Sequence, residues 1–131
     1  MQRKAINPWN WSLKLGYNQA ELITGAKQQL ICSGQTSVDE NGAPQHEKDM
    51  RAQIKLSLEN LETILKQSDM SLSDCFKLTI YVTDMDAALE NFDIIGQKFG
   101  AANNTPPMSL IGVQRLALPQ LMFEIEAIAQ N

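Results

Sequence analysis

Two stretches of this chain carry apolar residues at the spacing of an amphipathic helix, and strand-like runs separate and flank them. In the first stretch the apolar positions recur every three or four residues, at Met50, Ile54, Leu58, Leu61 and Leu65. In the second they follow an N-cap signature at residues 83–86 and precede Gly100, at Leu89, Phe92, Ile95 and Phe99. We therefore predict two helices, the first ending near residues 68–69 and the second at Gly100.

Strand-like runs account for most of the remaining chain. The predicted strands cover residues 17–21, 30–35, 75–82, 109–116 and 121–129. The first two are expected to form a hairpin across a turn at residues 24–26, and the last two to pair as neighbours across a short loop. Residues 75–82 alternate apolar and polar side chains, which indicates a strand with one buried face.

The order strand, strand, helix, strand, helix, strand, strand predicts an α+β domain. Two right-handed crossover connections over a single sheet would pack both helices on one face. In the last strand Phe123, Ile125 and Ala127 suit the covered side, so the bare side carries Met122, Glu124, Glu126 and Ile128. A face that mixes carboxylates with large apolar groups is typical of an oligomer surface, and we expect copies of the chain to pack there.

Length and composition indicate a single domain and restrict the molecules that the protein can bind. A chain of 131 residues suits one domain, which we take as residues 1–131 with an N-terminal extension over residues 1–16. The net charge of −4 disfavours nucleic acid as a partner. No apolar run approaches the roughly 18 residues of a membrane span, and no export signal is visible, so we expect a cytoplasmic protein with no membrane partner. Cys32 and Cys75 lack metal-binding spacing, which indicates reduced core thiols.

Few residues carry an obvious chemical motif. The backbone origins of Glu124 and Glu126 lie about 6.6 Å apart on one strand face, a spacing that ordinary solvated strand charges share. The only histidine, His46, lies in a polar stretch and is expected on the surface. The acidic residues 84 and 86 suit a helix N-terminus better than a metal. Gly34, at a strand end, suits the close approach of a ligand to the backbone.

Five stretches together resemble the Rid family, also called YjgF, from about residue 17 to residue 129. These stretches are Tyr17-Asn18-Gln19-Ala20, Cys32-Ser33-Gly34-Gln35-Thr36, Leu58-Glu59-Asn60-Leu61, Lys77-Leu78-Thr79-Ile80-Tyr81-Val82 and Phe123-Glu124-Ile125-Glu126-Ala127-Ile128-Ala129. The resemblance implies a chorismate-mutase-like fold, a homotrimer and three small-molecule clefts at the subunit interfaces. It also implies hydrolysis of reactive enamines and imines to a keto compound and ammonia, with no metal or cofactor.

The same resemblance assigns roles to particular residues. Tyr17 matches the family's pocket tyrosine, Ser33 and Gly34 its strand-end backbone contact, and Asn91 its helix asparagine. Glu124 matches the glutamate that positions water. The resemblance therefore implies Tyr17 and Glu124 as catalytic residues, with the other three in substrate binding.

One position departs from the family's deaminases, which carry an arginine in a Pro-Ala-Arg-Ser stretch. Here the chain reads Pro106-Pro107-Met108-Ser109. A guanidinium grips a carboxylate through two charge-assisted bonds of about 1.5–3 kcal/mol each, so its loss should weaken recognition of an amino-acid-derived imine about a hundredfold or more. Leu110 makes this part of the cleft more apolar, and Arg115 lies about 23 Å further along an extended strand.

Two functions remain open on this evidence. One is a hydrolase in which Glu124 activates water against an electrophile that needs no carboxylate. The other is a module that binds or senses a small, partly apolar metabolite, an alternative that Met108 favours. A ribonuclease or translation inhibitor is disfavoured by the acidic balance and by the lack of a histidine base. Trp9 and Trp11 either cover the cleft or anchor the N-terminal segment.

Overall fold

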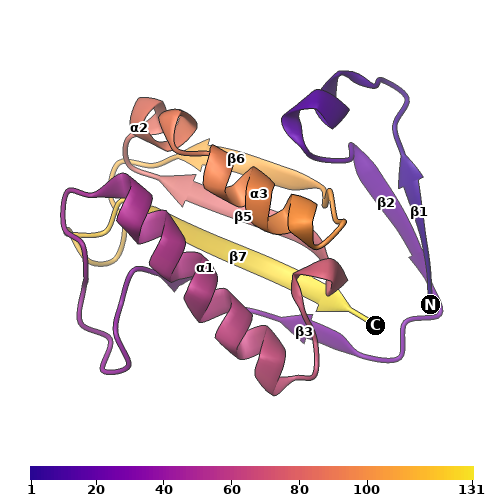
Figure 1. The fold of residues 1–131 in the computed structure, drawn as a ribbon, viewed down its shortest axis with the longest axis horizontal. Coiled ribbons are helices and arrows are strands. Elements are labelled where there is room, and N and C mark those ends of the chain that lie inside the picture. The colour runs from indigo at the N-terminus through magenta and orange to yellow at the C-terminus, as the bar shows by residue number, and fades with distance from the viewer.

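The computed structural model describes residues 1–131 and contains two β-sheets and three α-helices (Figure 1). The larger sheet has the strand order β3-β7-β5-β6, with β4 also paired to β7, and the smaller sheet consists of β1 and β2. The strands are β1 (Gln2–Ile6), β2 (Ala20–Thr24), β3 (Gln29–Ile31), β4 (Gln35–Thr36), β5 (Cys75–Val82), β6 (Met108–Gly112) and β7 (Phe123–Gln130). The helices are α1 (Met50–Gln67), α2 (Met85–Glu90) and α3 (Asp93–Ala101), with 3-10 turns η1 (Trp11–Leu15) and η2 (Leu72–Asp74). No helix is both long and apolar enough to cross a membrane.

β7 lies in the middle of the larger sheet. It is antiparallel to β5 on one edge and to β3 and β4 on the other. Its side chains alternate as the sequence predicts: Phe123, Ile125 and Ala127 are buried, whereas Glu124 and Glu126 are half-buried on the face without helices. The assignment of covered and bare sides is therefore confirmed for residues 123–127, whereas Met122 precedes β7 and packs against the core.

The two closing strands are not neighbours, and that prediction is wrong. β6 pairs in parallel with β5, with Met108 opposite Leu78 and Leu110 opposite Ile80. The helical connection after β5 carries the chain back to the start of the sheet, so β6 runs parallel to β5 and takes one of its edges. β7 takes the other edge. The alternation of apolar and polar residues along a strand specifies which of its side chains are buried. It does not specify which other strand is its neighbour in the sheet.

The helices cover one face of the larger sheet, as predicted (Figure 1). α1 follows the expected span, and the Asp49 carboxylate caps it by accepting a bond from the backbone of Ala52 at 3.0 Å. The second predicted helix is instead two helices, α2 and α3, separated at residues 91 and 92. Asn91 closes α2 because its side chain donates to the carbonyl of Ala87 at 2.8 Å. The prediction of two helices on one face is thereby corrected to three.

The core lies between the larger sheet and the helices. Its largest fully buried side chains include Ile54, Leu58, Leu78, Phe99 and Phe123. Both cysteines are free and buried, which confirms their assignment as core thiols. Burial raises the pKa of Cys75 to about 12, so this thiol stays protonated at neutral pH.

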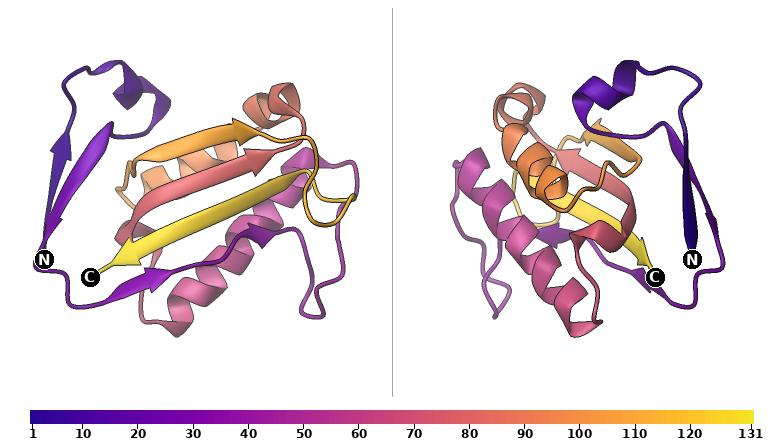
Figure 2. Two further views of the ribbon diagram at one scale, coloured as in Figure 1. Left: turned by 180° about the vertical axis from the view of Figure 1, so that it is seen from behind. Right: turned by 45° about the vertical axis from the view of Figure 1, so that its right-hand side comes forward.

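The N-terminal residues form a separate two-stranded ribbon, β1–β2, in which Ile6 lies opposite Ala20. β2 pairs with β1 and β3 pairs with β7, so the predicted hairpin between residues 17–21 and 30–35 is wrong. The ribbon stands beside the end of the larger sheet at which both chain termini lie (Figure 2). The length of chain between β2 and β3 is short, and the two strands nevertheless belong to different sheets.

Candidate functional site

One pocket gathers three of the residues that the sequence indicates. Its volume is about 600 Å³, and six of its seven lining residues are hydrophobic. It is lined by Leu15, Tyr17, Leu89, Phe92, Met108, Ser109 and Leu110. We call this the apolar pocket. Tyr17 is held there by an edge-to-face contact with Trp11, whose ring centroid lies 6.2 Å from that of Tyr17.

The sheet register explains why Met108 and Leu110 line the apolar pocket. Both residues are level with buried residues of β5, so their side chains point to the helix-covered face. β6 is an edge strand, and both side chains remain partly exposed while packing against the core. Phe92 lies directly after the break between α2 and α3, and Leu89 is 57% exposed rather than buried. The break therefore opens this side of the pocket.

A second group of predicted residues meets at the start of β7. The Glu124 side chain lies so close to Gly34 that a Cβ on Gly34 would be 2.5 Å from the Glu124 carboxylate oxygen Oε1. A side chain at position 34 would therefore displace the Glu124 carboxylate from this place. Ser33 is exposed beside them, and its carbonyl accepts a bond from the Gln35 side chain at 3.1 Å. We call Ser33, Gly34 and Glu124 the glutamate site.

The electrostatics of the glutamate site raise the pKa of its carboxyl group. Burial raises the pKa of Glu124 above its usual value, and the negative charge of Glu126 on the same strand raises it further. Tyr81 lies opposite Glu124 on β5. The pKa of Tyr81 is also raised, by desolvation, by a hydrogen bond to Glu126 and by the two carboxylate charges. A carboxyl group whose pKa is shifted toward neutrality is suited to move protons.

Within one chain the apolar pocket and the glutamate site lie on opposite faces of the sheet. Glu124 is level with Tyr81 and Ile111 on the bare face, whereas Met108 and Leu110 point toward the helices. Alternate residues of a strand point to opposite faces, so these two groups cannot face one ligand in the same chain.

The polar atoms of Asn91 are largely engaged elsewhere. Its amide nitrogen bonds Ala87, and its oxygen accepts a long bond of 3.4 Å from Arg51. Asn91 is next to the pocket residue Phe92 in sequence, but it does not line the apolar pocket itself. Its contribution in this structure is to end α2.

Cations near these groups are few. The Arg115 guanidinium bonds the carbonyls of Leu116 and Ala117 in its own loop. Lys77 donates from Nζ to the hydroxyl of Ser109 at 3.1 Å, on the bare face. Sequence reasoning missed Lys77 because it reads as an ordinary polar position in an alternating strand. No group of three histidine, cysteine or acidic side chains is placed to hold a metal ion.

Comparisons with known proteins identify relatives of the whole chain. The profile of a family described as Endoribonuclease L-PSP matches residues 12–131. A RutC family protein of Pyrococcus horikoshii is 29% identical over 126 residues, which cover 96% of this chain and 89% of that protein. TdcF of Escherichia coli, provisionally named a reactive intermediate deaminase, is 34% identical over 82 residues, covering 62% of this chain and 63% of TdcF.

Solved structures extend this similarity to the backbone. YyfB from Yersinia pestis, described as a Rid family protein of unknown function, superposes over 100% of both chains with a TM-score of 0.89 and 31% identity. The structure of TdcF with bound serine covers 88% of this chain and 87% of its own, with a TM-score of 0.71 and 30% identity. The match to YyfB therefore includes the N-terminal ribbon.

Proposed function

This chain belongs to the YjgF/Rid family, and from that premise we propose that it hydrolyses the imine or enamine of a small, predominantly uncharged metabolite. An enamine would first become its imine by gaining a proton on carbon and losing one from nitrogen. Water would then add to the carbon of the C=N bond, a proton would pass from the added water to nitrogen, the C–N bond would break, and a carbonyl compound and ammonia would leave. The cleft would lie between copies of the chain in a homotrimer, with the apolar pocket from one copy and the glutamate site from the next.

The observation that carries this proposal is the position of the Glu124 carboxyl group. It lies against the backbone of Gly34, and its pKa is raised by burial and by Glu126. A carboxylate of raised pKa is a stronger base toward water, and a larger fraction of the group is in the acid form that can protonate a leaving amine. Tyr17 would close the opposite side of the cleft. Ser33 and Gly34 would offer backbone groups to the substrate.

Met108 supports the restriction to uncharged substrates. The pocket beside it has one polar lining residue, Ser109, whose hydroxyl already accepts a bond from Lys77. Lys77 approaches Ser109 from the bare face, so a substrate carboxylate placed beside Met108 on the helix side would lose its hydration without gaining a paired cation. TdcF was solved with serine bound, so the ligand of that relative carries the charged groups that this pocket does not suit.

A binding or sensing module is the second candidate function. The same apolar pocket would hold a neutral metabolite without turning it over, and the predominantly apolar lining around Met108 is the observation that favours it. The family description also names an endoribonuclease. The single histidine, His46, is exposed in the loop before α1 and belongs to neither half of the cleft, and the net charge of −4 repels a phosphate backbone.

Ammonia release separates these functions. The wild-type chain should hydrolyse an imine generated by an amine oxidase from a neutral amine, and should act about a hundredfold less well on 2-aminoacrylate. Met108→Arg should raise kcat/KM for 2-aminoacrylate about tenfold to a hundredfold, whereas the matched Met108→Leu variant should not. Equal wild-type rates on the two substrates would contradict the role given to Met108.

Glu124→Gln tests the catalytic carboxyl. It should lower kcat for the neutral imine about a hundredfold, the usual contribution of a positioned acid or base. The enzyme proposal fails if no imine is turned over by the wild-type chain. In that case, binding of the neutral carbonyl product to wild type, weakened in Met108→Arg, would support the binding module.

Mixing inactive variants tests the location of the cleft. Tyr17→Ala and Glu124→Gln should each be inactive alone, because each removes one half of every cleft. Subunits exchanged between the two should regain activity, because some clefts then combine an intact apolar pocket with an intact glutamate site. Absence of recovery, with exchange verified by mass spectrometry, would contradict a cleft shared between copies.

A further inference from the structure

Two strand edges of this protein are unpaired, and they belong to consecutive strands. β3 pairs with β7 on one edge only. Gln28 exchanges backbone bonds with Asn131, and Cys32 donates to Ala127, so the alternate residues Gln29 and Ile31 direct their backbone groups to the free edge. β2 likewise has one free edge, because the smaller sheet contains only β1 and β2. Exposed edges are templates for pairing with another strand.

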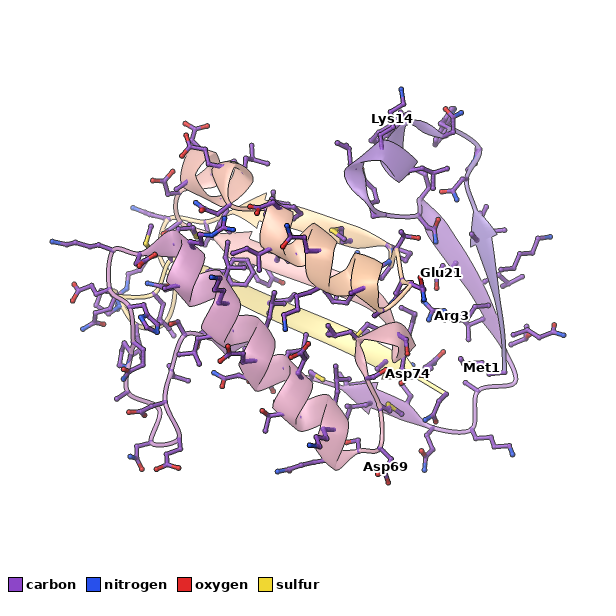
Figure 3. The ribbon with its side chains drawn as sticks, viewed as in Figure 1. Met1, Arg3, Lys14, Glu21, Asp69 and Asp74 are labelled. Carbon is purple, nitrogen blue, oxygen red and sulfur yellow. The ribbon has the colours of Figure 1, made fainter.

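The ribbon is held away from β3 by a directional network centred on Arg3. Its guanidinium bonds the Glu21 carboxylate at 2.8 and 2.9 Å, and Figure 3 shows these two side chains next to each other. The carbonyls of Ser73 and Cys75 accept bonds from the same guanidinium at 2.6 and 3.0 Å. It also donates to the side-chain oxygen of Asn104 at 3.1 Å. The Glu21 side chain is only 6% exposed, so loss of Arg3 would leave this carboxylate without its ion-pair partner in a buried position.

A second anchor lies at the start of β2. The backbone N–H of Asn18 donates to the carbonyl of Thr105 at 2.8 Å, and the side chain of Asn18 bonds that of Glu21 at 3.2 Å. For β2 to reach β3 of the same chain, both anchors would have to break. The free edge of β3 is therefore available to a strand from elsewhere.

We propose that β2 of one copy pairs with the free edge of β3 in a second copy, while the ribbon keeps its contacts with its own chain. The occupant is a second copy because the chain itself supplies a strand suited to this edge. β2 and β3 are joined by only residues 25–28, an arrangement that normally produces an antiparallel hairpin. Pairing between copies would form the same contacts without breaking the Arg3 network, which is the principle of strand exchange.

The exposed side chains agree with this pairing. A connection of residues 25–28 places Leu22 opposite Ile31 and Ala20 opposite Ser33 in an antiparallel register. Leu22 is 57% exposed and Ile31 is 71% exposed, and Ile31 lies beside Ile128 on the bare face. The pairing would bury both side chains in one apolar strip that continues onto β7.

The consequence for the cleft rests on the function proposed above. Tyr17 precedes β2 by three residues, and Ser33 follows β3 by two. Antiparallel pairing of β2 with the β3 of another copy therefore brings the Tyr17 end of one chain to the Ser33 end of the next. The apolar pocket of one copy and the glutamate site of its neighbour would then meet along one continuous sheet.

Disulfide trapping tests the strand pairing. Leu22→Cys and Ile31→Cys are introduced into separate chains. The two proteins are mixed, their subunits are allowed to exchange, and the cysteines are then oxidised. The expected product is a disulfide between the two different chains, seen as a doubled mass on a non-reducing gel and identified by peptide mass spectrometry. The native Cys32 and Cys75 are buried, and burial raises the pKa of both thiols, so they should not compete. Lys55→Cys, on the exposed side of α1, replaces Ile31→Cys in the control mixture and should give no link.

A second cysteine pair tests the register proposed for β2 of one copy against β3 of the other. Ala20→Cys and Ser33→Cys should link in the same way, and adding Ile31→Pro to the Ser33→Cys chain should abolish the link. Proline at Ile31 removes an N–H that faces the free edge and leaves the bonds to β7 intact. If a chain carrying both cysteines of a pair links only within itself and the mixtures give no product, the ribbon folds back on its own β3 and the proposal is wrong. None of these readouts needs turnover, so a failure of the proposed activity would leave this test standing.

Discussion

The larger sheet and the N-terminal ribbon of this protein are held in place by different forces. In the larger sheet, Leu58 of α1, Ile80 of β5 and Phe123 of β7 have no exposed surface and pack in one core. In the ribbon, Leu22 is 57% exposed and Trp11 is 53% exposed, while Arg3 makes contacts to four residues. Burial of apolar area locates the sheet, and directional polar contacts locate the ribbon.

This difference explains why the two regions respond differently to sequence reasoning. The hydrophobic effect is non-directional and is spread over many side chains, so its pattern is visible as periodicity along the chain. A network of polar groups depends on a few residues that are distant in sequence, such as Arg3 and Asn104. Its members look like ordinary surface residues until the fold brings them together.

The largest effect is expected in the core. Phe123→Ala removes a fully buried ring and should lower the free energy of unfolding by about 3–5 kcal/mol, measured by urea denaturation. The matched ribbon variant Ile6→Ala trims a side chain that is 37% exposed and takes no part in the proposed pairing between copies, and it should change the free energy of unfolding by less than about 1 kcal/mol. Similar losses in both variants would show that the two regions are not held differently.

The next effect separates the ribbon from the sheet. Arg3→Met leaves the Glu21 carboxylate, 6% exposed, without its cation, and breaking a buried pair costs about 3–5 kcal/mol. The cost should appear as release of the ribbon, so backbone amides of β1 and β2 should exchange with solvent faster while those of β5 and β7 keep their protection.

The control for this variant is Arg51→Met. The ion pair of Arg51 with Asp93 is exposed on both sides and should contribute less than about 1 kcal/mol. Retained protection of β1 and β2 in Arg3→Met would mean that apolar contacts hold the ribbon after all.

Asn104 connects the two regions, and its loss should have an intermediate effect. Its amide group donates to the carbonyls of Leu72 and Cys75 at 2.8 and 2.7 Å, and its oxygen accepts from Arg3. Asn104→Ala should lower the free energy of unfolding by about 1–3 kcal/mol and also raise exchange in β1 and β2. Loss of global stability with an unchanged ribbon would show that Asn104 serves the sheet alone.

The smallest effect on stability is expected at Glu124, a residue of the larger sheet whose contribution comes from the charge of its carboxyl group. Its raised pKa means that the folded state disfavours the charged carboxylate. The resulting loss of folding stability is absent in acid, where the group is protonated in both states, and reaches its full size once the pH exceeds the pKa of the folded state. Glu124→Gln removes this loss and should raise Tm by about 1–2 °C at neutral pH, with no difference near pH 3. Calorimetry across this range checks the sign, and a Tm lowered at neutral pH would contradict it.

Sequence reasoning succeeded where local periodicity decides the structure. The span of α1, the buried face of β7 and the burial of Cys32 and Cys75 all follow from the spacing of apolar residues. It failed for the break at Asn91, because a single side chain bonding the carbonyl of Ala87 interrupts a helical pattern that otherwise continues.

The apolar pocket and the glutamate site also depend on contacts that local periodicity does not reveal. The resemblance singled out Tyr17, Met108 and Glu124, and the structure brings Tyr17 and Met108 into one pocket. Glu124 lies on the other face of the sheet, against Gly34. The pocket residues Leu89 and Phe92 looked like core positions of a continuous helix, and only the break between α2 and α3 turns them toward the pocket.

By itself the sequence determined the buried side chains of α1, β5 and β7, because the periods of helix and strand map onto a covered and a bare side. The tertiary structure alone decided which strands are neighbours: β6 beside β5, β7 between β5 and β3, and β2 apart from β3. The physical reason is that ladder hydrogen bonds join backbone groups, which are the same in every residue. Contacts between distant residues, such as Arg3 with Glu21 and Asn104, then select one pairing among those that the backbone allows.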